Sequence, residues 1–196
     1  YLSDAFAREN FEFYKKMLNG QKAQEPRWKR VLESLNDTMG MALGELYVAE
    51  AFPPESKQRA QALVDNVSAA LKTRLEKLDW MGEETRKRAL EKWSTFLPKI
   101  GYPDTWRDWS GLSIVPGDYY ANVLAAKRYD YRYEMAKVGK PTDRLEWGMT
   151  PQTVNAYYNP TDNTINFPAA ILQPPFFDAK ADGALNYGGV RPGVGH

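Results

Sequence analysis

The sequence TVNAYYNPTDNTINFP, residues 153–168, combines two short strand-forming stretches with a turn-forming stretch between them. TVNAYY and TINFP contain threonine, tyrosine and other residues that favour extended backbone. The intervening NPTDN supplies asparagine, proline and aspartate, which favour turns. We therefore predict a hairpin or two adjacent strands here. Because the chain before this point is predicted to be helical, we expect a mainly α fold with a small β element (α+β).

Residues 1–98 are predicted to form successive helices, because their apolar residues recur three and four positions apart. The FPPE sequence, residues 52–55, should end one helix and start the next, since proline fits a first helical turn. Pro98 is expected to end the last of these helices. The predicted helices cover about 6–18, 26–51, 54–78 and 83–97, with a further one at about 118–137.

The stretch KIGYPDTWRDWSGLSIVPGD, residues 99–118, has a different texture, with several glycine and proline residues and two tryptophans. Such a composition is typical of a hinge or a crossover between domains. We predict a crossover linker at 101–117. It would separate a helical part, 1–100, from a second part, 118–196. The N-terminal residues resemble the middle of a helix, and we expect both ends to be cut from a longer chain.

The composition excludes several classes of function. Lysine and arginine number 26 and aspartate and glutamate 25, which leaves no basic excess for binding nucleic acid. The chain of 196 residues has no cysteine, so disulfides, cysteine zinc sites and thiol nucleophiles are excluded. No stretch approaches the roughly 18 apolar residues that a membrane helix needs.

Common catalytic patterns are also missing. The pair Glu83-Glu84 lies among basic residues on a predicted helix, which indicates a solvated face with ion pairs. NYGGV, residues 186–190, lacks the spacing and the lysine of a phosphate-binding loop. The tyrosines of KRYDYRYEM, residues 127–135, are predicted to pack on a helix face rather than stack on nucleotide bases. His196 is the only histidine, and no serine is placed to form a triad with it.

Residues 147–177, WGMTPQTVNAYYNPTDNTINFPAAILQPPFF, followed by NYGG, closely resemble the neprilysin family of zinc metallopeptidases. Upstream, PRWKRV, LGELYVAEAFPPESK, LDWMGEETRKRALEKW and KIGYP resemble the same family in the same order. The resemblance covers the chain up to Val190 and is specific, because many separate motifs agree. It implies the last helices of a helical cap domain, then the N-terminal part of a zincin-like catalytic domain.

The resemblance also implies substrate-binding residues. In the family, the segment matching Asn155 and Ala156 forms an edge strand that pairs with the peptide substrate, as in β-augmentation. The Asn155 amide can both donate and accept, so it would clamp one peptide group, and the Ala156 backbone would continue the pairing. Ile171 and Phe176 match positions lining the pocket for the residue after the scissile bond. For these two side chains, ordinary core packing is an equal alternative.

His196 matches the first zinc histidine of the family's H-E-x-x-H motif. The family form before it is close to GGxGAVIGHE, whereas this chain has GGVRPGVGH. The residues 191–193, Arg-Pro-Gly, replace small and apolar residues, and proline and glycine are poor choices inside a helix. A catalytic zinc needs three protein ligands and a water, so we expect this chain to bind zinc weakly and to be inactive alone.

The resemblance therefore implies a zinc-dependent endopeptidase or oligopeptidase that cleaves short peptides on the amino side of apolar residues. Its cofactor would be zinc, its partner a peptide substrate, and its location outside the cytoplasm, in a bacterial periplasm or secreted. The alternative is a non-catalytic helical module that binds peptides or proteins. Neither the natural substrate nor the oligomeric state follows from the sequence.

Overall fold

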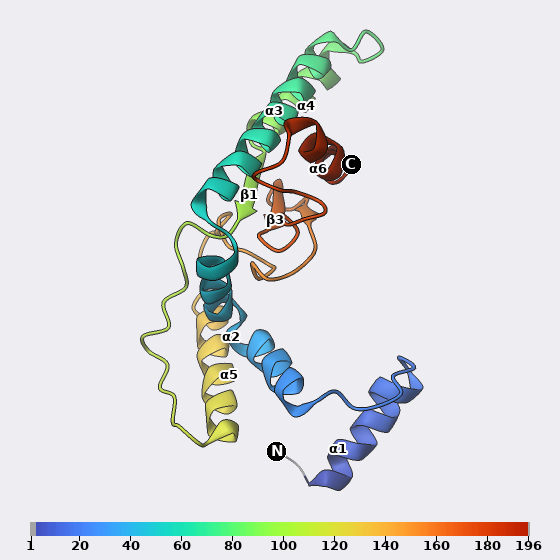
Figure 1. Ribbon diagram of the computed structural model, residues 1–196. Helices are drawn as coiled ribbons and strands as arrows, with labels where there is room; N and C mark the ends of the chain where they lie inside the picture. The colour runs from blue at the N-terminus through green and yellow to red at the C-terminus, as the bar shows by residue number, and fades with distance from the viewer. Residues whose placement is uncertain (1–2, 196) are drawn as a thin grey trace. The chain divides into compact units, whose positions relative to one another are not determined.

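The computed structural model describes residues 3–195, with side chains up to Val190 (Figure 1). The chain forms two compact units that alternate along the sequence. One comprises the chain up to Gly40 together with Asp108–Lys140. The other comprises Met41–Arg107 and the chain from Pro141 onward. The sequence-based division at 101–117 stays a prediction, and each unit is described by itself below.

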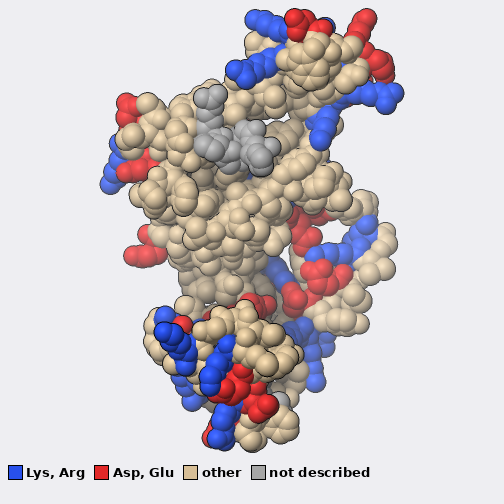
Figure 2. All heavy atoms as spheres, turned by 90° about the vertical axis from the view of Figure 1, so that its right-hand side faces the viewer, with Lys and Arg blue, Asp and Glu red and all other residues tan. Residues whose placement is uncertain are grey.

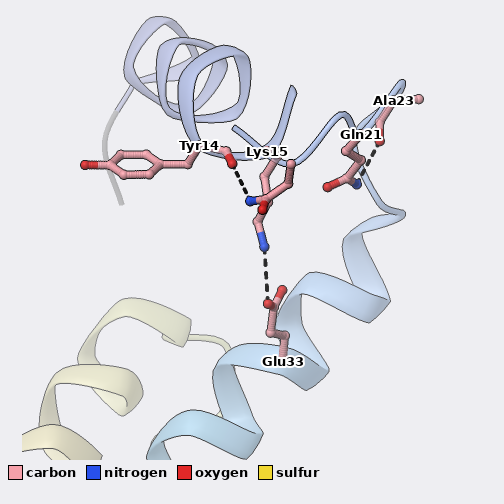
Figure 3. Close-up of polar contacts among 6 residues, drawn as sticks. Tyr14, Lys15, Gln21, Ala23 and Glu33 are labelled. Atoms are coloured by element: carbon pink, nitrogen blue, oxygen red, sulfur yellow. Dashed lines mark hydrogen bonds and ion pairs between the residues drawn. The ribbon is translucent and has the colours of Figure 1, made fainter. Parts of the chain in front are cut away.

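The first unit is built from helices. Its elements are α1 (Asp4–Asn10), the π-helix η1 (Phe11–Met17), the N-terminal part of α2 (Arg27–Ala51) and α5 (Tyr119–Met135). Figure 3 shows Lys15 of η1 reaching Glu33 of α2, at 3.4 Å. Asp118 caps α5 by accepting a hydrogen bond from the Ala121 N–H at 2.9 Å. This cap explains why the helix starts where the sequence predicts it.

The second unit contains the sheet and four helical segments, counted within residues 3–195. The helices are the C-terminal part of α2, α3 (Pro54–Lys77), α4 (Glu83–Ser94) and α6 (Gly183–Gly195). The strands are β1 (Leu97–Gly101), β2 (Tyr157–Asn159) and β3 (Thr164–Pro168), in the order β1-β3-β2. β1 runs parallel to β3, and β2 runs antiparallel to it. β3 is therefore the central strand, and it is buried along its whole length.

The core of this unit lies between the sheet and α3. Ile100 of β1 and Phe167 of β3 are partners across the sheet and are almost completely buried. Phe52, at the end of α2, and Val64 of α3 are each 1% exposed. These four side chains belong to one buried cluster that α6 also joins through Val190. The cluster holds the helices and the sheet together as one body.

The predicted fold class, mainly α with a small β element, is confirmed. The predicted hairpin is present as β2 and β3, and Pro54 starts α3 as expected. One assignment is wrong, because residues 97–101 form β1 rather than a helix end and the start of a crossover. The reason is non-local, since β1 exists only through its pairing with β3 far along the chain.

Charged side chains of both signs lie next to one another on the face shown in Figure 2. Figure 2 shows lysine and arginine beside aspartate and glutamate near the end of α3 and α4, without a patch of one sign. One such pair is Arg88 with Glu84, whose atoms lie 3.0 Å apart on consecutive turns of α4. Among residues 3–195, no helix has the length and apolar character needed to cross a membrane.

Candidate functional site

Asn155 and Ala156 lie immediately before β2, the strand at one edge of the sheet. Within the described part of the chain, β2 pairs with β3 on one side only. An antiparallel edge strand leaves alternate N–H and C=O groups pointing away from its neighbour. These groups can pair with an added peptide strand. The geometry at β2 therefore has the edge that the sequence predicts.

The Asn155 side chain is exposed and already makes a hydrogen bond to its neighbour. Its Oδ1 accepts from the Ala156 N–H at 2.8 Å, while the Asn155 N–H donates to the Thr153 carbonyl at 3.0 Å. The two groups predicted to bind substrate, the Asn155 amide oxygen and the Ala156 N–H, are thus hydrogen-bonded to each other in this structure. A peptide that used both groups would have to replace this internal bond. The sequence gives no sign of this pairing.

The other predicted site residues differ in burial. Ala156 and Ile171 are partly buried and pack against the same buried cluster. Phe176 is 46% exposed. Packing against the core thus explains why an apolar residue is present at position 171. Phe176, in contrast, has a large exposed surface that a ligand could cover. Their predicted roles in a specificity pocket stay predictions.

Asn163 anchors the turn between β2 and β3 to the end of α4. Its backbone is left-handed, with φ of 54°. Its Nδ2 donates to the Lys92 carbonyl at 2.8 Å and to Thr95 Oγ1 at 2.9 Å, and its Oδ1 accepts from Tyr158 Oη at 3.0 Å. One amide therefore caps α4 and holds a β2 side chain. These bonds fix the hairpin that carries the edge strand.

Asn163→Ala is expected to lower the free energy of unfolding by about 2–3 kcal/mol, because it removes these bonds and strains the left-handed backbone. Asn163→Gly is the matched variant, since glycine adopts this backbone freely and loses only the bonds. Its loss should be smaller by about 1 kcal/mol. Urea denaturation followed by tryptophan fluorescence measures both. Equal losses in the two variants would contradict the assigned backbone strain.

Three polar side chains, one from each strand, form a row across one face of the sheet. Lys99 of β1, Asn166 of β3 and Tyr157 of β2 occupy partnered positions on adjacent strands. Lys99 Nζ donates to the Glu146 carbonyl at 2.6 Å, and the Gly148 N–H donates to Tyr157 Oη at 2.8 Å. The segment containing Glu146 and Gly148 therefore covers this face and ties down β2.

Burial shifts the pKa values of two side chains in this row, Lys99 and Tyr157. Desolvation lowers the pKa of the Lys99 amine, and nearby carboxylates, with Asp162 the strongest, oppose that shift. Burial also raises the pKa of the Tyr157 hydroxyl. Asn166 is fully buried, and its Oδ1 has no hydrogen-bond partner among residues 3–195. The alternation of polar and apolar residues in TINFP was the available signal for this polar face, and sequence reasoning missed it.

The loop of residues 173–182, which carries Phe176, is joined to α6. Asn186 of α6 is 5% exposed and makes two bonds to one residue of the loop. Its Oδ1 accepts from the Asp178 N–H at 2.9 Å, and its Nδ2 donates to the Asp178 carbonyl at 2.8 Å. We call this pair of bonds the Asn186 clamp. The family resemblance includes NYGG, residues 186–189, but it does not imply this role for Asn186.

Gly189 brings α6 against the same loop. A Cβ built on Gly189 would lie 2.3 Å from the Phe176 carbonyl oxygen and 3.1 Å from its carbonyl carbon. Only a glycine leaves room for this approach of two backbones. Figure 1 shows α6 beside α3, and Asn66 of α3 donates to Tyr187 Oη at 2.8 Å. The helix is thus fixed on two sides.

The expected metal ligand, His196, lies outside the described residues. Within residues 3–195, no group of three or more histidine, cysteine, aspartate or glutamate side chains could hold a metal ion. The described residues therefore do not fit a zinc site by themselves. α6 continues to Gly195, so residues 191–193 are helical. Proline and glycine are poor choices inside a helix, and the structure nevertheless has residues 191–193 within α6.

Two family models match the sequence, both described as peptidase family M13, over residues 1–103 and 155–196. The endothelin-converting enzyme homolog of Locusta migratoria is 36% identical over 203 residues, which is 100% of this chain and 28% of that protein. The structure of Mycobacterium tuberculosis zinc metalloprotease Zmp1 in its open state superposes with a TM-score of 0.89 at 50% identity. The match covers 100% of this chain and 30% of the Zmp1 chain.

A crystal structure of PEPO from Lactobacillus rhamnosis is also similar, with a TM-score of 0.85 and 30% identity. The match covers 100% of this chain and 31% of that chain. The sequence described here thus spans less than a third of the length of these relatives.

Proposed function

The chain belongs to peptidase family M13, and on that basis we propose that it supplies the substrate-holding edge of a zinc-dependent endopeptidase. The relatives are named as a zinc metalloprotease and as an endothelin-converting enzyme homolog. The reaction would be hydrolysis of a peptide bond in a short peptide, on the amino side of an apolar residue. The observation that carries the proposal is the position of Asn155 and Ala156 immediately before edge strand β2.

The peptide would add to β2 as a further strand. Its backbone groups would pair with the outward-facing groups of β2, as in other cases of β-augmentation. Asn155 would give up its bond to the Ala156 N–H, which frees the amide to bind one peptide group and the N–H to bind another. The hydrogen bonds supporting Asn163 and Tyr157 would keep β2 in place during this exchange.

The residue after the scissile bond would be recognised near Phe176 and Ile171. The exposed part of the Phe176 ring offers apolar surface, and burying such surface stabilises a complex by roughly 25 cal/mol per Å². Ile171 would support this wall from the buried cluster against which it packs. This arrangement favours an apolar side chain over a charged one.

Zinc in the complete enzyme would polarise the scissile carbonyl and lower the pKa of a bound water. The described residues do not hold the metal, and we propose that the chain alone binds zinc weakly and does not catalyse hydrolysis. We also propose a location outside the cytoplasm, in the periplasm or secreted, with a peptide as the partner. The comparisons do not favour the alternative of a non-catalytic helical module.

Asn155→Ala, in the enzyme that contains this sequence, tests the proposal. We expect kcat/KM for an internally quenched peptide to fall about tenfold, because a substrate hydrogen bond contributes roughly 1–1.5 kcal/mol. The zinc content, measured by atomic absorption, should not change. Thr161→Ala is a suitable control, because Thr161 lies in the turn beyond β2 and its N–H and Oγ1 both donate to Asn159 Oδ1. An unchanged kcat/KM, or a loss of zinc, would contradict the role given to Asn155.

A further inference from the structure

The Asn186 clamp is a connection between the loop of residues 173–182 and α6. Both atoms of the amide are used, one accepting from the Asp178 N–H and the other donating to the Asp178 carbonyl. The side chain is 5% exposed, so water competes weakly for these bonds. Losing either bond costs stability, because a buried polar group is then left unsatisfied. The clamp therefore fixes Asp178 relative to α6.

A second contact lies two residues before Asp178. The Phe176 carbonyl sits against the backbone of Gly189, where even a methyl group would overlap it. Phe177, between these two contacts, is 3% exposed and belongs to the buried cluster. Phe176 is therefore held through its backbone on the α6 side, while the residue as a whole remains 46% exposed. The ring itself receives little support from the core.

The rest of the loop is held by α3 and by the start of α6. Arg59 of α3 donates a hydrogen bond to the Ala179 carbonyl. Asp182 Oδ1 accepts from the Ala184 N–H at 2.7 Å in the first turn of α6. These contacts hold the far end of the loop. Asn186 and Gly189 join the end carrying Phe176 to α6. The same end is also tied to the end of α2, because Gln173 Nε2 donates to the Ala51 carbonyl at 2.9 Å and the Gln173 carbonyl accepts from the Phe176 N–H at 3.0 Å.

We propose that Asn186 is a positioning residue for substrate selection. It joins the loop that carries Phe176, a wall of the proposed pocket, to α6, so that loop and helix move as one body. The proposal rests on the proposed function, in which Phe176 lines the pocket for the residue after the scissile bond. Without the clamp, the loop would lose both hydrogen bonds between Asp178 and α6, and the close approach at Gly189 and the packing of Phe177 would remain. The ring could then adopt several positions, and the pocket would discriminate less between large and small apolar side chains.

The first test uses the chain of 196 residues and needs no variant. Amide hydrogen exchange reports the free energy of the opening that exposes each N–H. If loop and helix open together, the Asp178 N–H should have the same opening free energy as the Tyr187 and Val190 amides of α6. An Asp178 N–H that exchanges many-fold faster than these amides would overturn the proposal, since the loop would then open without the helix.

The second test uses the enzyme that contains this sequence and two internally quenched peptides. The peptides differ only in the residue after the cleaved bond, which is leucine in one and alanine in the other. A difference of this size in an apolar pocket changes kcat/KM by roughly 10-fold or more. Asn186→Ala is expected to reduce the leucine-to-alanine ratio of kcat/KM about fivefold, chiefly by lowering the value for the leucine peptide.

Gly188→Ala is the matched control, because a Cβ there has no neighbour within 4 Å among the described atoms although it lies on the same helix. Its ratio should equal that of the unmodified enzyme. If Asn186→Ala lowers kcat/KM equally for both peptides, the residue stabilises the fold without affecting selection, and the proposal is wrong. If the unmodified enzyme cleaves neither peptide, the proposed function fails, while hydrogen exchange still tests the connection between loop and helix.

Discussion

Replacing Gly101 by alanine is expected to lower the free energy of unfolding of the sheet-containing unit by about 3 kcal/mol. Gly101 ends β1 with φ of +79°, and this left-handed backbone costs an alanine about 1–2 kcal/mol. Its Cβ would lie 2.8 Å from Cε1 of Phe52, which is 1% exposed. Because the ring is enclosed, it cannot yield freely, and overpacking adds roughly 1–3 kcal/mol. Urea denaturation followed by tryptophan fluorescence measures the loss.

A double variant separates the two causes. Phe52→Leu removes part of the ring that the new methyl group would overlap, so it relieves the steric component but not the backbone strain. The combination with Gly101→Ala should be more stable than the sum of the two single losses implies, by about 1 kcal/mol. Additive losses would show that the packing of Gly101 against Phe52 does not limit substitution.

Gly189→Ala is expected to cost a similar amount, about 3 kcal/mol. The new methyl group would meet the Phe176 carbonyl oxygen at 2.3 Å and the carbonyl carbon at 3.1 Å. Both are backbone atoms, so a side-chain rotation cannot relieve the overlap, and α6 must shift away from the loop. The same denaturation experiment measures this change, and hydrogen exchange of the Asp178 N–H should accelerate with it.

Gly188→Ala supplies the comparison for this effect too. Its methyl group meets no neighbour, and alanine favours a helix interior over glycine by about 1 kcal/mol. This variant should therefore be as stable as the unmodified chain or slightly more stable. Opposite effects at two adjacent glycines would locate the helix–loop contact at a single residue. If Gly189→Ala were also tolerated, the close approach at Phe176 would be wrong.

The local elements could be predicted from the sequence because their signals lie within a few residues. FPPE marks the boundary between α2 and α3, Asp118 marks the start of α5, and NPTDN marks the turn between β2 and β3. Each depends on proline geometry, a side-chain cap or a turn preference. These preferences act before the chain has folded, so they can be read without a structure.

The remaining features depend on residues distant in sequence. β1 needs β3 as its partner, and Pro98 within it gives no local indication of a strand. The Asn163 cap needs the end of α4, which precedes it by a long stretch of chain. The Asn186 clamp lies between two elements that are close in sequence, but it needs the burial that α3 and the core provide. No local preference encodes such contacts.

The candidate site shows the same distinction. The resemblance implies that Asn155 and Ala156 belong to an edge strand that pairs with substrate, and the structure has them immediately before edge strand β2, while their role in binding stays a prediction. Their mutual hydrogen bond follows from the backbone conformation at that point, which no motif specifies. Phe176 was predicted as a pocket residue, but its dependence on α6 was not, because a motif records which residue is present and not what holds it.

The order β1-β3-β2 also constrains how the protein can be made. Asp108–Lys140, the segment contributed to the other unit, is synthesised after β1 and before β3. On the ribosome, β1 therefore emerges without a partner, and α5 is complete before the sheet can close. Parallel pairing over such a separation is slow, because the intervening chain must be ordered first. The helical unit can thus assemble before β3, the central strand of the sheet, has been synthesised.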